Sequence, residues 1–189
     1  SRCCDQVTID PAGNVMACFP GKDPAIPVVM VYAHMDQLGF VVRFIEPTGY
    51  LLLERLGGIP EKVLPGLRIQ IRTGAGTWVP GIIGSKSHHA TPADEKYKAD
   101  PIDGLFVDIG ARSADEVCAL GIRVGSPAIY EPACHTLANS RICGTAVDNR
   151  GGLTALVLLA EQLKSEPPAG TVWLVGTVWE EFNLRGAML

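Results

Sequence analysis

The chain has 189 residues, of which 47% are hydrophobic and 19% are charged, and its formal net charge is −4. This content is sufficient for a core in one large or two small domains, and the acidic balance without a Lys/Arg run argues against a nucleic-acid-binding surface. No apolar stretch approaches the roughly 20 residues that span a bilayer, and the N-terminus has no charged region followed by an apolar one, so we expect neither membrane insertion nor export.

The first predicted elements are strands. Residues 6–9 and 15–19 flank a turn cluster at 10–14 (DPAGN), which predicts an antiparallel hairpin. Residues 27–32 (PVVMVY) and 171–178 (TVWLVGTV) are apolar on both alternations. This pattern is typical of fully buried strands in a parallel sheet.

The stretch 40–128 has a different pattern. Short β-rich runs are separated by Gly/Pro turns at short intervals, which predicts a small barrel or sandwich. One helix is expected within it, over 114–120, because Ser113 and Glu116 have the spacing of a capping box and Gly121 follows.

A helical pattern follows Asp148. Its expected apolar face consists of Leu153, Leu156, Val157, Ala160 and Leu163, and the segment 167–170 (PPAG) ends it. The predicted fold class is therefore α/β, with a framework formed by 1–39 and 129–189 and a β-rich domain inserted at 40–128.

Acidic and histidine side chains lie at the ends of these elements, where the ligand site of an open α/β sheet is found. His34 and Asp36 would share one face of an extended chain, so the carboxylate can orient the imidazole while its other nitrogen binds a metal. If Glu180 and Glu181 are still in the strand they face oppositely, so one can ligate while the other reaches metal-bound water. Asp148 could bridge two ions about 3.5–4 Å apart.

Each residue also has a plainer interpretation. A single histidine after a strand is more often a core or surface residue, Asp148 before a helix is most often an N-cap, and paired glutamates are most often solvated. Their combination favours a metal site. His88 and His89 lie in a polar loop of the insertion and are expected to be exposed, so we do not assign them to this site.

The six cysteines do not form the paired C-x-x-C motifs of a structural zinc site. A chain of this size does not need disulfides for stability, so we expect free thiols in a reducing cytoplasm. The positions are Cys3, Cys4, Cys18, Cys118, Cys134 and Cys143.

Five ordered motifs carry a resemblance that covers nearly the whole chain. They are AHMDQLGF at 33–40, GIIGSK at 81–86, LFVDIGA at 105–111, AVDNR at 146–150 and EEFNLRGA at 180–187. On these motifs the chain resembles the dinuclear-metal tetrahedral and glutamyl aminopeptidases, a family whose members were formerly named cellulase M or endoglucanase.

The resemblance implies a zinc-peptidase-like catalytic domain with an inserted PDZ-like or barrel domain that serves in subunit assembly. By matching position, His34 is expected to bind one metal, Asp148 to bridge both, and Glu181 to bind the other. Glu180 is expected to act as the general base, with Asp36 as the carboxylate behind the histidine.

The implied activity is removal of N-terminal residues from peptides by a water activated between two divalent ions per full-length subunit, most readily zinc or cobalt. One ion would also bind the free α-amino group of the substrate. The implied protein is a cytoplasmic homo-oligomer assembled through the inserted domain, without nucleic-acid or membrane partners.

Three departures accompany the resemblance. The family's remaining Asp and His ligands are expected in a C-terminal half beyond Leu189, so we expect an incomplete chain that is inactive in isolation. Gln37 and Trp179 stand where the family usually has Glu and Gln.

Two alternative functions stay open. One is a glycoside hydrolase, which needs two carboxylates about 5–9.5 Å apart and no metal, and the other is a non-catalytic assembly module.

Overall fold

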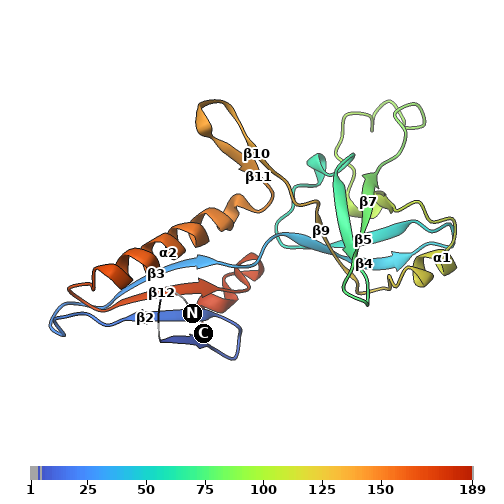
Figure 1. Ribbon diagram of the computed structural model, residues 1–189. Coiled ribbons are helices and arrows are strands. Elements are labelled where there is room, and N and C mark those ends of the chain that lie inside the picture. Colours follow the sequence, from blue (N-terminus) through green and yellow to red (C-terminus); the bar gives the residue numbers. More distant parts are fainter. Residues whose placement is uncertain (1–3, 5, 189) are drawn as a thin grey trace. The chain divides into compact units, whose positions relative to one another are not determined.

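The computed structural model describes residue 4 and residues 6–188. The chain divides into two compact units, Ser1–Gln37 with Ala146–Leu189, and Leu38–Thr145 (Figure 1). The sequence places these junctions at 39/40 and 128/129. The difference at the second junction is the stretch 129–145, which contacts mainly the second unit.

The first unit is a four-stranded sheet with one long helix. The strand order is β1 (Val7–Ile9), β2 (Val15–Phe19), β12 (Val172–Thr177) and β3 (Val29–His34). The predicted hairpin of β1 and β2 is present, and β12 runs antiparallel to β2 but parallel to β3. The sheet is therefore mixed, not wholly parallel. The parallel pair ends with Thr177 opposite His34, so both strands reach the same edge.

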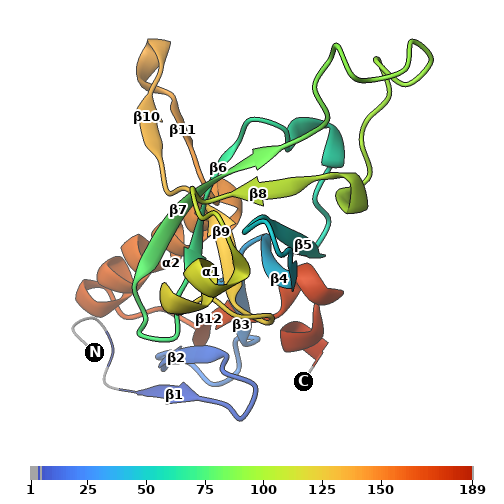
Figure 2. The same cartoon turned by 90° about the vertical axis from the view of Figure 1, so that its right-hand side faces the viewer.

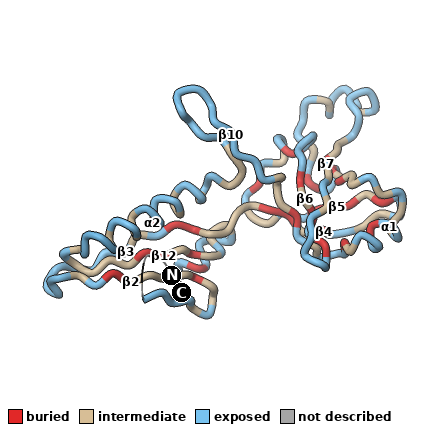
Figure 3. Tube along the Cα trace, in the orientation of Figure 1, coloured by how far each residue is buried: buried red, intermediate tan, exposed pale blue. Residues whose placement is uncertain are grey.

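Full burial of 27–32 was a wrong prediction for this part of the chain. Met30 and Tyr32 are 59% and 63% exposed, whereas Ala33 and His34 are buried. Figure 3 colours each strand by burial, and most of β3 is exposed or intermediate. The reason is positional, because within the described residues β3 is an edge strand of the sheet and the core contacts of the sheet are with α2. In β12, which lies between β2 and β3, Leu174, Val175 and Thr177 are buried but the other three residues are only partly buried, so full burial was wrong for this strand as well.

Helix α2 (Val147–Ser165) is the helix predicted after Asp148. Its apolar face packs with Phe19, Ala33 and Leu174 through the side chains of Leu153, Leu156, Leu159, Ala160 and Leu163. Val157, which was predicted on this face, is 55% exposed. At about 100° per residue it falls on the flank of the stripe that the other side chains form.

The second unit contains a closed six-stranded barrel in the order β4-β5-β8-β7-β6-β9 (Figure 2). The barrel alternative of the sequence prediction is therefore correct for this unit. Its strands are β4 (Gly39–Ile45), β5 (Leu51–Leu56), β6 (Arg68–Arg72), β7 (Trp78–Gly84), β8 (Phe106–Asp108) and β9 (Pro127–Tyr130). They enclose a separate core that includes Phe40, Leu51, Ile71 and Val107.

Short helices complete the barrel unit. The predicted helix is α1 (Ala114–Ala119), where the Ser113 hydroxyl accepts a hydrogen bond from the Glu116 N–H at 3.2 Å. Gly121 follows with φ +82°, as the sequence predicted for the helix end. The 3₁₀ turns are η1 (Glu61–Val63) and η2 (Ile102–Gly104).

One hairpin outside the barrel was not predicted. It is formed by β10 (Cys134–Thr136) and β11 (Ile142–Gly144) around the turn η3 (Ala138–Ser140), and it extends from the barrel unit as a two-stranded arm (Figures 1 and 2). No helix among the described residues is long and apolar enough to cross a membrane.

Candidate metal centre

The site begins where β3 and β12 end. The backbone N–H of Met35 donates to the carbonyl of Thr177 at 2.6 Å, which continues the parallel pairing one step past both strands. The segments that follow the two strands therefore leave the sheet side by side. The end of β3 carries His34 and the segment after it carries Asp36, while the segment after β12 carries Glu180 and Glu181.

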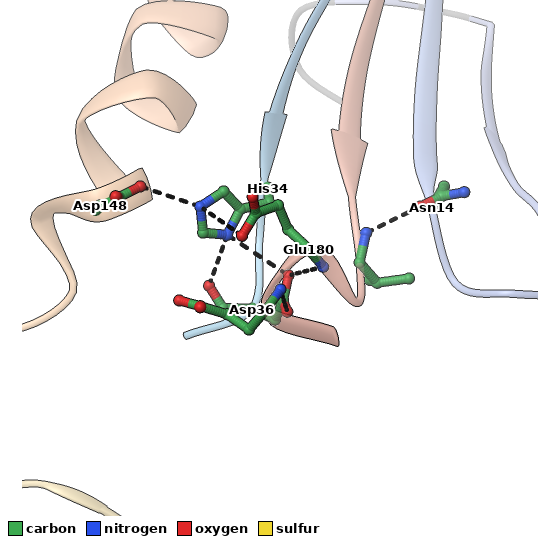
Figure 4. Close-up of polar contacts among 7 residues, drawn as sticks. Asn14, His34, Asp36, Asp148 and Glu180 are labelled. Carbon is green, nitrogen blue, oxygen red and sulfur yellow. Dashed lines mark hydrogen bonds and ion pairs between the residues drawn. The ribbon is translucent and has the colours of Figure 1, made fainter. Parts of the chain in front are cut away.

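The His34 side chain is 7% exposed, and acidic residues lie near both of its ring nitrogens (Figure 4). Nδ1 lies 3.1 Å from the backbone carbonyl of Asp36, and Nε2 lies 3.1 Å from Oδ1 of Asp148 and 3.8 Å from Oε2 of Glu180. When Nδ1–H donates to the Asp36 carbonyl, the Nε2 lone pair faces the carboxylates of Asp148 and Glu180. That tautomer can bind a cation through Nε2.

Electrostatics around His34 favour positive charge. Burial lowers the pKa of the imidazole, but the hydrogen bond with Asp148 and the nearby charges of Glu180 and Asp36 outweigh it, so the pKa is raised above its ordinary value. The position between these carboxylates is therefore a place where a positive charge is stabilised.

Asp36 was predicted to orient the imidazole. Its backbone carbonyl makes the closer contact with His34, while its Oδ1 lies 3.5 Å from Nδ1. The carboxylate instead accepts hydrogen bonds from the backbone N–H groups of Glu180 at 3.2 Å and Glu181 at 3.1 Å. Asp36 thus joins the segment after β3 to the segment after β12.

Glu180 and Glu181 lie in the 3₁₀ turn η4 (Glu180–Phe182), followed by η5 (Arg185–Met188), and not in the strand. The strand ends at Thr177, and Trp179 has φ +62°, so the chain has left the extended conformation before Glu180. The alternating orientation that a strand would give is therefore lost. Both carboxylates can present an oxygen to the same point as His34, and the three donor atoms lie within 4.8 Å of one another.

Glu181 experiences competing influences. Burial raises the pKa of its carboxyl, repulsion by Glu180 raises it further, and attraction to His34 only partly offsets these effects. Two carboxylates that meet in this way are relieved by a cation placed between them.

Asp148 does not cap α2. The N-cap position is Ala146, with φ +56° and no side-chain hydrogen bond, and Asp148 and Asn149 have non-helical backbone angles and are joined by a cis peptide bond. The N-cap interpretation of Asp148 is therefore wrong. Its 91% exposed carboxylate instead reaches Nε2 of His34, while Asn149 Oδ1 accepts from the N–H of Gly152 at 2.9 Å.

Sequence reasoning missed Asn14, the residue that follows the turn between β1 and β2. Its side chain is buried and contacts the chain on both sides of the two glutamates, at Val178 and Gly186. An asparagine after Asp-Pro-Ala-Gly signals a turn, and this local signal says nothing about partners more than 160 residues away.

A cavity of about 230 Å³ adjoins the cluster and is lined by Tyr32, His34, Thr177, Glu180, Leu184 and others. Its walls combine the candidate ligands with apolar side chains. His88 and His89, which the sequence did not assign to the site, are exposed, and their ring centroids lie 5.9 Å apart.

The donor set fits a divalent cation. It consists of one imidazole nitrogen and three nearby carboxylates, those of Asp148, Glu180 and Glu181. Zinc and related ions in hydrolytic enzymes take their ligands from such groups, and a carboxylate that does not ligate can act as a base. A histidine and several carboxylates thus lie together at the carboxyl end of a parallel strand pair. This arrangement is typical of α/β proteins with a metal-dependent hydrolytic site.

Residues 13–189 match the M42 glutamyl aminopeptidase family, and the chain belongs to that family. The SgcX protein of Escherichia coli (strain K12) is 40% identical over 182 residues, which are 96% of this chain and 48% of that protein. The lysyl aminopeptidase of Pyrococcus furiosus is 35% identical over 185 residues, covering 97% of this chain and 51% of the relative.

Among solved structures, the TET aminopeptidase of the archaeon Thaumarchaeota archaeon SCGC AB-539-E09 superposes with a TM-score of 0.90 at 36% identity. The match covers 98% of this chain and 52% of that one. The chain therefore spans about half the length of the relatives that it matches.

Proposed function

We propose that this chain supplies part of the active site of a metal-dependent aminopeptidase, which removes N-terminal residues from peptides. The observation that carries the proposal is the convergence of His34, Glu180 and Glu181 donor atoms within 4.8 Å, in a member of the M42 glutamyl aminopeptidase family. The function rests on residues from both strand ends, which the parallel pairing of β3 and β12 brings together.

We assign the residues as follows. His34 would bind one of two divalent cations, zinc or cobalt, Glu181 would bind the other, and Asp148 would bridge them. Such cations polarise the peptide carbonyl and make water more acidic. The contact of Asp148 with Nε2 of His34 supports its assignment, because its carboxylate already faces the nitrogen that would bind the metal.

Glu180 is the proposed general base. Its carboxylate is partly exposed and lies 3.8 Å from His34 Nε2, beside the cavity that could admit substrate. It would accept a proton from the attacking water and deliver it to the leaving amine. Asp36 holds the backbone of Glu180 through its N–H, so we assign Asp36 as the residue that positions the base.

The glycoside hydrolase alternative is not favoured. That chemistry places two carboxylates on either side of a sugar linkage, about 5–9.5 Å apart. Here Glu180 and Glu181 present oxygens to a shared point with His34, and the family to which the chain belongs is one of aminopeptidases.

The remaining parts of the proposal concern the whole protein. The first unit would be the zinc-peptidase-like catalytic domain. The barrel would be the PDZ-like assembly domain of a homo-oligomer, supported by the exposed apolar side chains of Phe44, Trp78 and Ile82 on its strands. The five described cysteines are free, which supports a reducing compartment such as the cytoplasm; Cys3 lies outside the described residues.

The test uses the full natural chain and compares wild type with Glu180→Gln. Loss of the general base is expected to lower turnover of aminoacyl substrates by about 10²–10⁴-fold while the metal content per chain is unchanged. Glu161→Gln, an exposed position on α2, is the matched control and should behave as wild type. Unchanged turnover in Glu180→Gln would refute the assignment of the base, and a wild-type protein without bound metal would favour the assembly module.

A further inference from the structure

The segment 178–186, which carries both glutamates, is held at its two ends by one side chain. Asn14 Oδ1 accepts the N–H of Val178 at 2.9 Å, immediately after β12 ends, and Asn14 Nδ2 donates to the carbonyl of Gly186 at 2.8 Å. Asn14 is 4% exposed, so these hydrogen bonds are shielded from water. Figure 4 shows the Asn14 side chain directed at this segment from the neighbouring strand.

The conformation of this segment needs such support. Trp179, Asn183 and Leu184 all have φ between +59° and +63°, a region that residues other than glycine rarely adopt. A segment with three such residues persists when contacts outside it fix its shape. Among the described residues, Asn14 makes such contacts at the two ends, Asp36 makes them at Glu180 and Glu181, and His34 lies 3.8 Å from the Glu180 carboxylate.

Asn14 is itself fixed in place by Asp10. One carboxylate oxygen of Asp10 accepts the backbone N–H groups of Ala12, Gly13 and Asn14 at 2.8–2.9 Å. The other oxygen accepts Asn14 Nδ2 at 2.7 Å. The amide orientation is therefore set by its partners, because Nδ2 has two acceptors and Oδ1 has one donor.

We infer that Asn14 is a positioning residue for the metal centre, which it serves by fixing the segment that carries Glu180 and Glu181. The inference rests on the proposed function. Asn14 touches neither glutamate side chain; it acts through Val178 and Gly186, which frame them. Its loss should allow the two carboxylates to depart from the point where they meet His34, and this would weaken cation binding as well as turnover.

The experiment uses the full natural chain and measures zinc affinity by competition with a chelator, together with kcat and KM. Asn14→Ala is expected to lower zinc affinity at least about tenfold, the lower end of the effect of removing supporting groups around a metal. kcat should fall by a similar factor or more, and KM should change less. The control is Leu156→Val, a core change in the same unit that weakens packing but leaves the segment's hydrogen bonds in place.

A second variant covers the case in which Asn14→Ala does not fold. The second variant exchanges the two residues, as Asp10→Asn with Asn14→Asp. An amide and a carboxylate can then still contact each other, and the carboxylate at position 14 can still accept the N–H of Val178. The exchange replaces the donor to Gly186 by a carboxylate oxygen, which repels the Gly186 carbonyl, and it moves the negative charge from position 10 to position 14. This variant should fold and still show lowered zinc affinity.

The outcomes separate the two proposals. If the wild type neither binds zinc nor cleaves peptides, the proposed function fails. If the wild type does both, and the exchanged pair or Asn14→Ala matches the Leu156→Val control in zinc affinity and kcat, then Asn14 is only a structural residue and this inference is overturned.

Discussion

Asp36 connects two separated segments through a single carboxylate. Both of its oxygens are used by backbone N–H groups of the Glu180–Glu181 turn, and its own carbonyl contacts His34. A carboxylate that accepts backbone N–H groups makes charge-assisted hydrogen bonds, which are stronger than neutral ones. The residue therefore fixes the relative positions of the imidazole and the two glutamates.

Asp36→Ala removes both acceptors and is expected to lower zinc affinity or turnover by about 10–100-fold. Asp36→Asn keeps one acceptor oxygen, so its loss should be smaller. Zinc titration and steady-state kinetics on the full natural chain measure both. Equal effects of the two variants would contradict a role that depends on the number of accepted hydrogen bonds.

At the residue scale, the sequence predicted which side chains meet, but not how. His34, Asp148, Glu180 and Glu181 were predictable because they lie at the ends of apolar segments, and such ends converge in an α/β sheet. The position of Glu180 and Glu181 in a 3₁₀ turn beyond the end of β12 was not predictable. It depends on the left-handed backbone of Trp179 and on Asn14, whose partner Val178 is 164 positions away.

At the scale of elements, α2 and β3 make close contact at a glycine. A Cβ added at Gly152 would meet Ala33 Cβ at 3.0 Å and would collide with the side chain of Asn149. The Oδ1 atom of that asparagine, the residue after Asp148, accepts the N–H of Gly152. The small residue at 152 therefore allows the helix start to lie against the strand that carries His34.

Gly152→Ala is expected to destabilise the first unit by about 1–3 kcal/mol, because the overpacking cost exceeds the gain in helix propensity. Gly151→Ala is the matched control, since a Cβ there meets nothing within 4 Å. The control should gain about 0.5–1 kcal/mol from helix propensity alone. Urea unfolding of both variants measures the difference, and a stabilised Gly152→Ala would show that the contact is relaxed in solution.

The hairpin of β1 and β2 should be sensitive to acid through Asp10. Desolvation raises the pKa of this carboxyl, but the hydrogen bonds from the Asn14 side chain and from the N–H groups of Asn14, Gly13 and Ala12 outweigh it, so the pKa is lowered. A carboxyl with a lower pKa in the folded state contributes stability above its unfolded value of about 3.9, and this contribution disappears as pH falls through the folded value.

Asp10→Asn is therefore expected to be less stable than wild type at pH 7, with the gap narrowing only below about pH 4. Urea midpoints at pH 7, 5 and 3 provide the measurement. A gap that stayed constant over this range would mean that the charge of Asp10 does not contribute.

The elements themselves were largely predictable, and their exposure was not. Apolar runs and turn residues located the hairpin, β12, α1, α2 and the strands of the barrel, because these signals are local. The exposure of Met30 and Tyr32 depends on which elements lie beside β3. Val157 is exposed because of its angular position on α2, which a list of apolar residues does not give.

At the scale of the whole molecule, the chain contains two separate cores. The larger lies within the barrel unit, and the smaller joins α2 to the sheet; the two share no buried residue among those described. The candidate ligands all belong to the smaller unit, Ser1–Gln37 with Ala146–Leu189. Cation binding should therefore stabilise one unit and leave the other unchanged.

Tryptophan fluorescence can report on each unit alone. The experiment uses the 189-residue chain, whose three tryptophans are Trp78 in the barrel and Trp173 and Trp179 in the unit with the candidate ligands. In Trp78→Phe, zinc at a hundredfold above its Kd is expected to stabilise the reported unit by about 2.7 kcal/mol, the effect of a ligand that binds only the folded state. In the double variant Trp173→Phe with Trp179→Phe, the unfolding transition of the barrel should not move.

Adding His34→Ala to Trp78→Phe should abolish most of the stabilisation by zinc, because it removes the imidazole from the donor set. A shift that survives this change, or one that appears equally in the barrel, would place the bound zinc elsewhere on the chain and contradict the assignment of the metal centre.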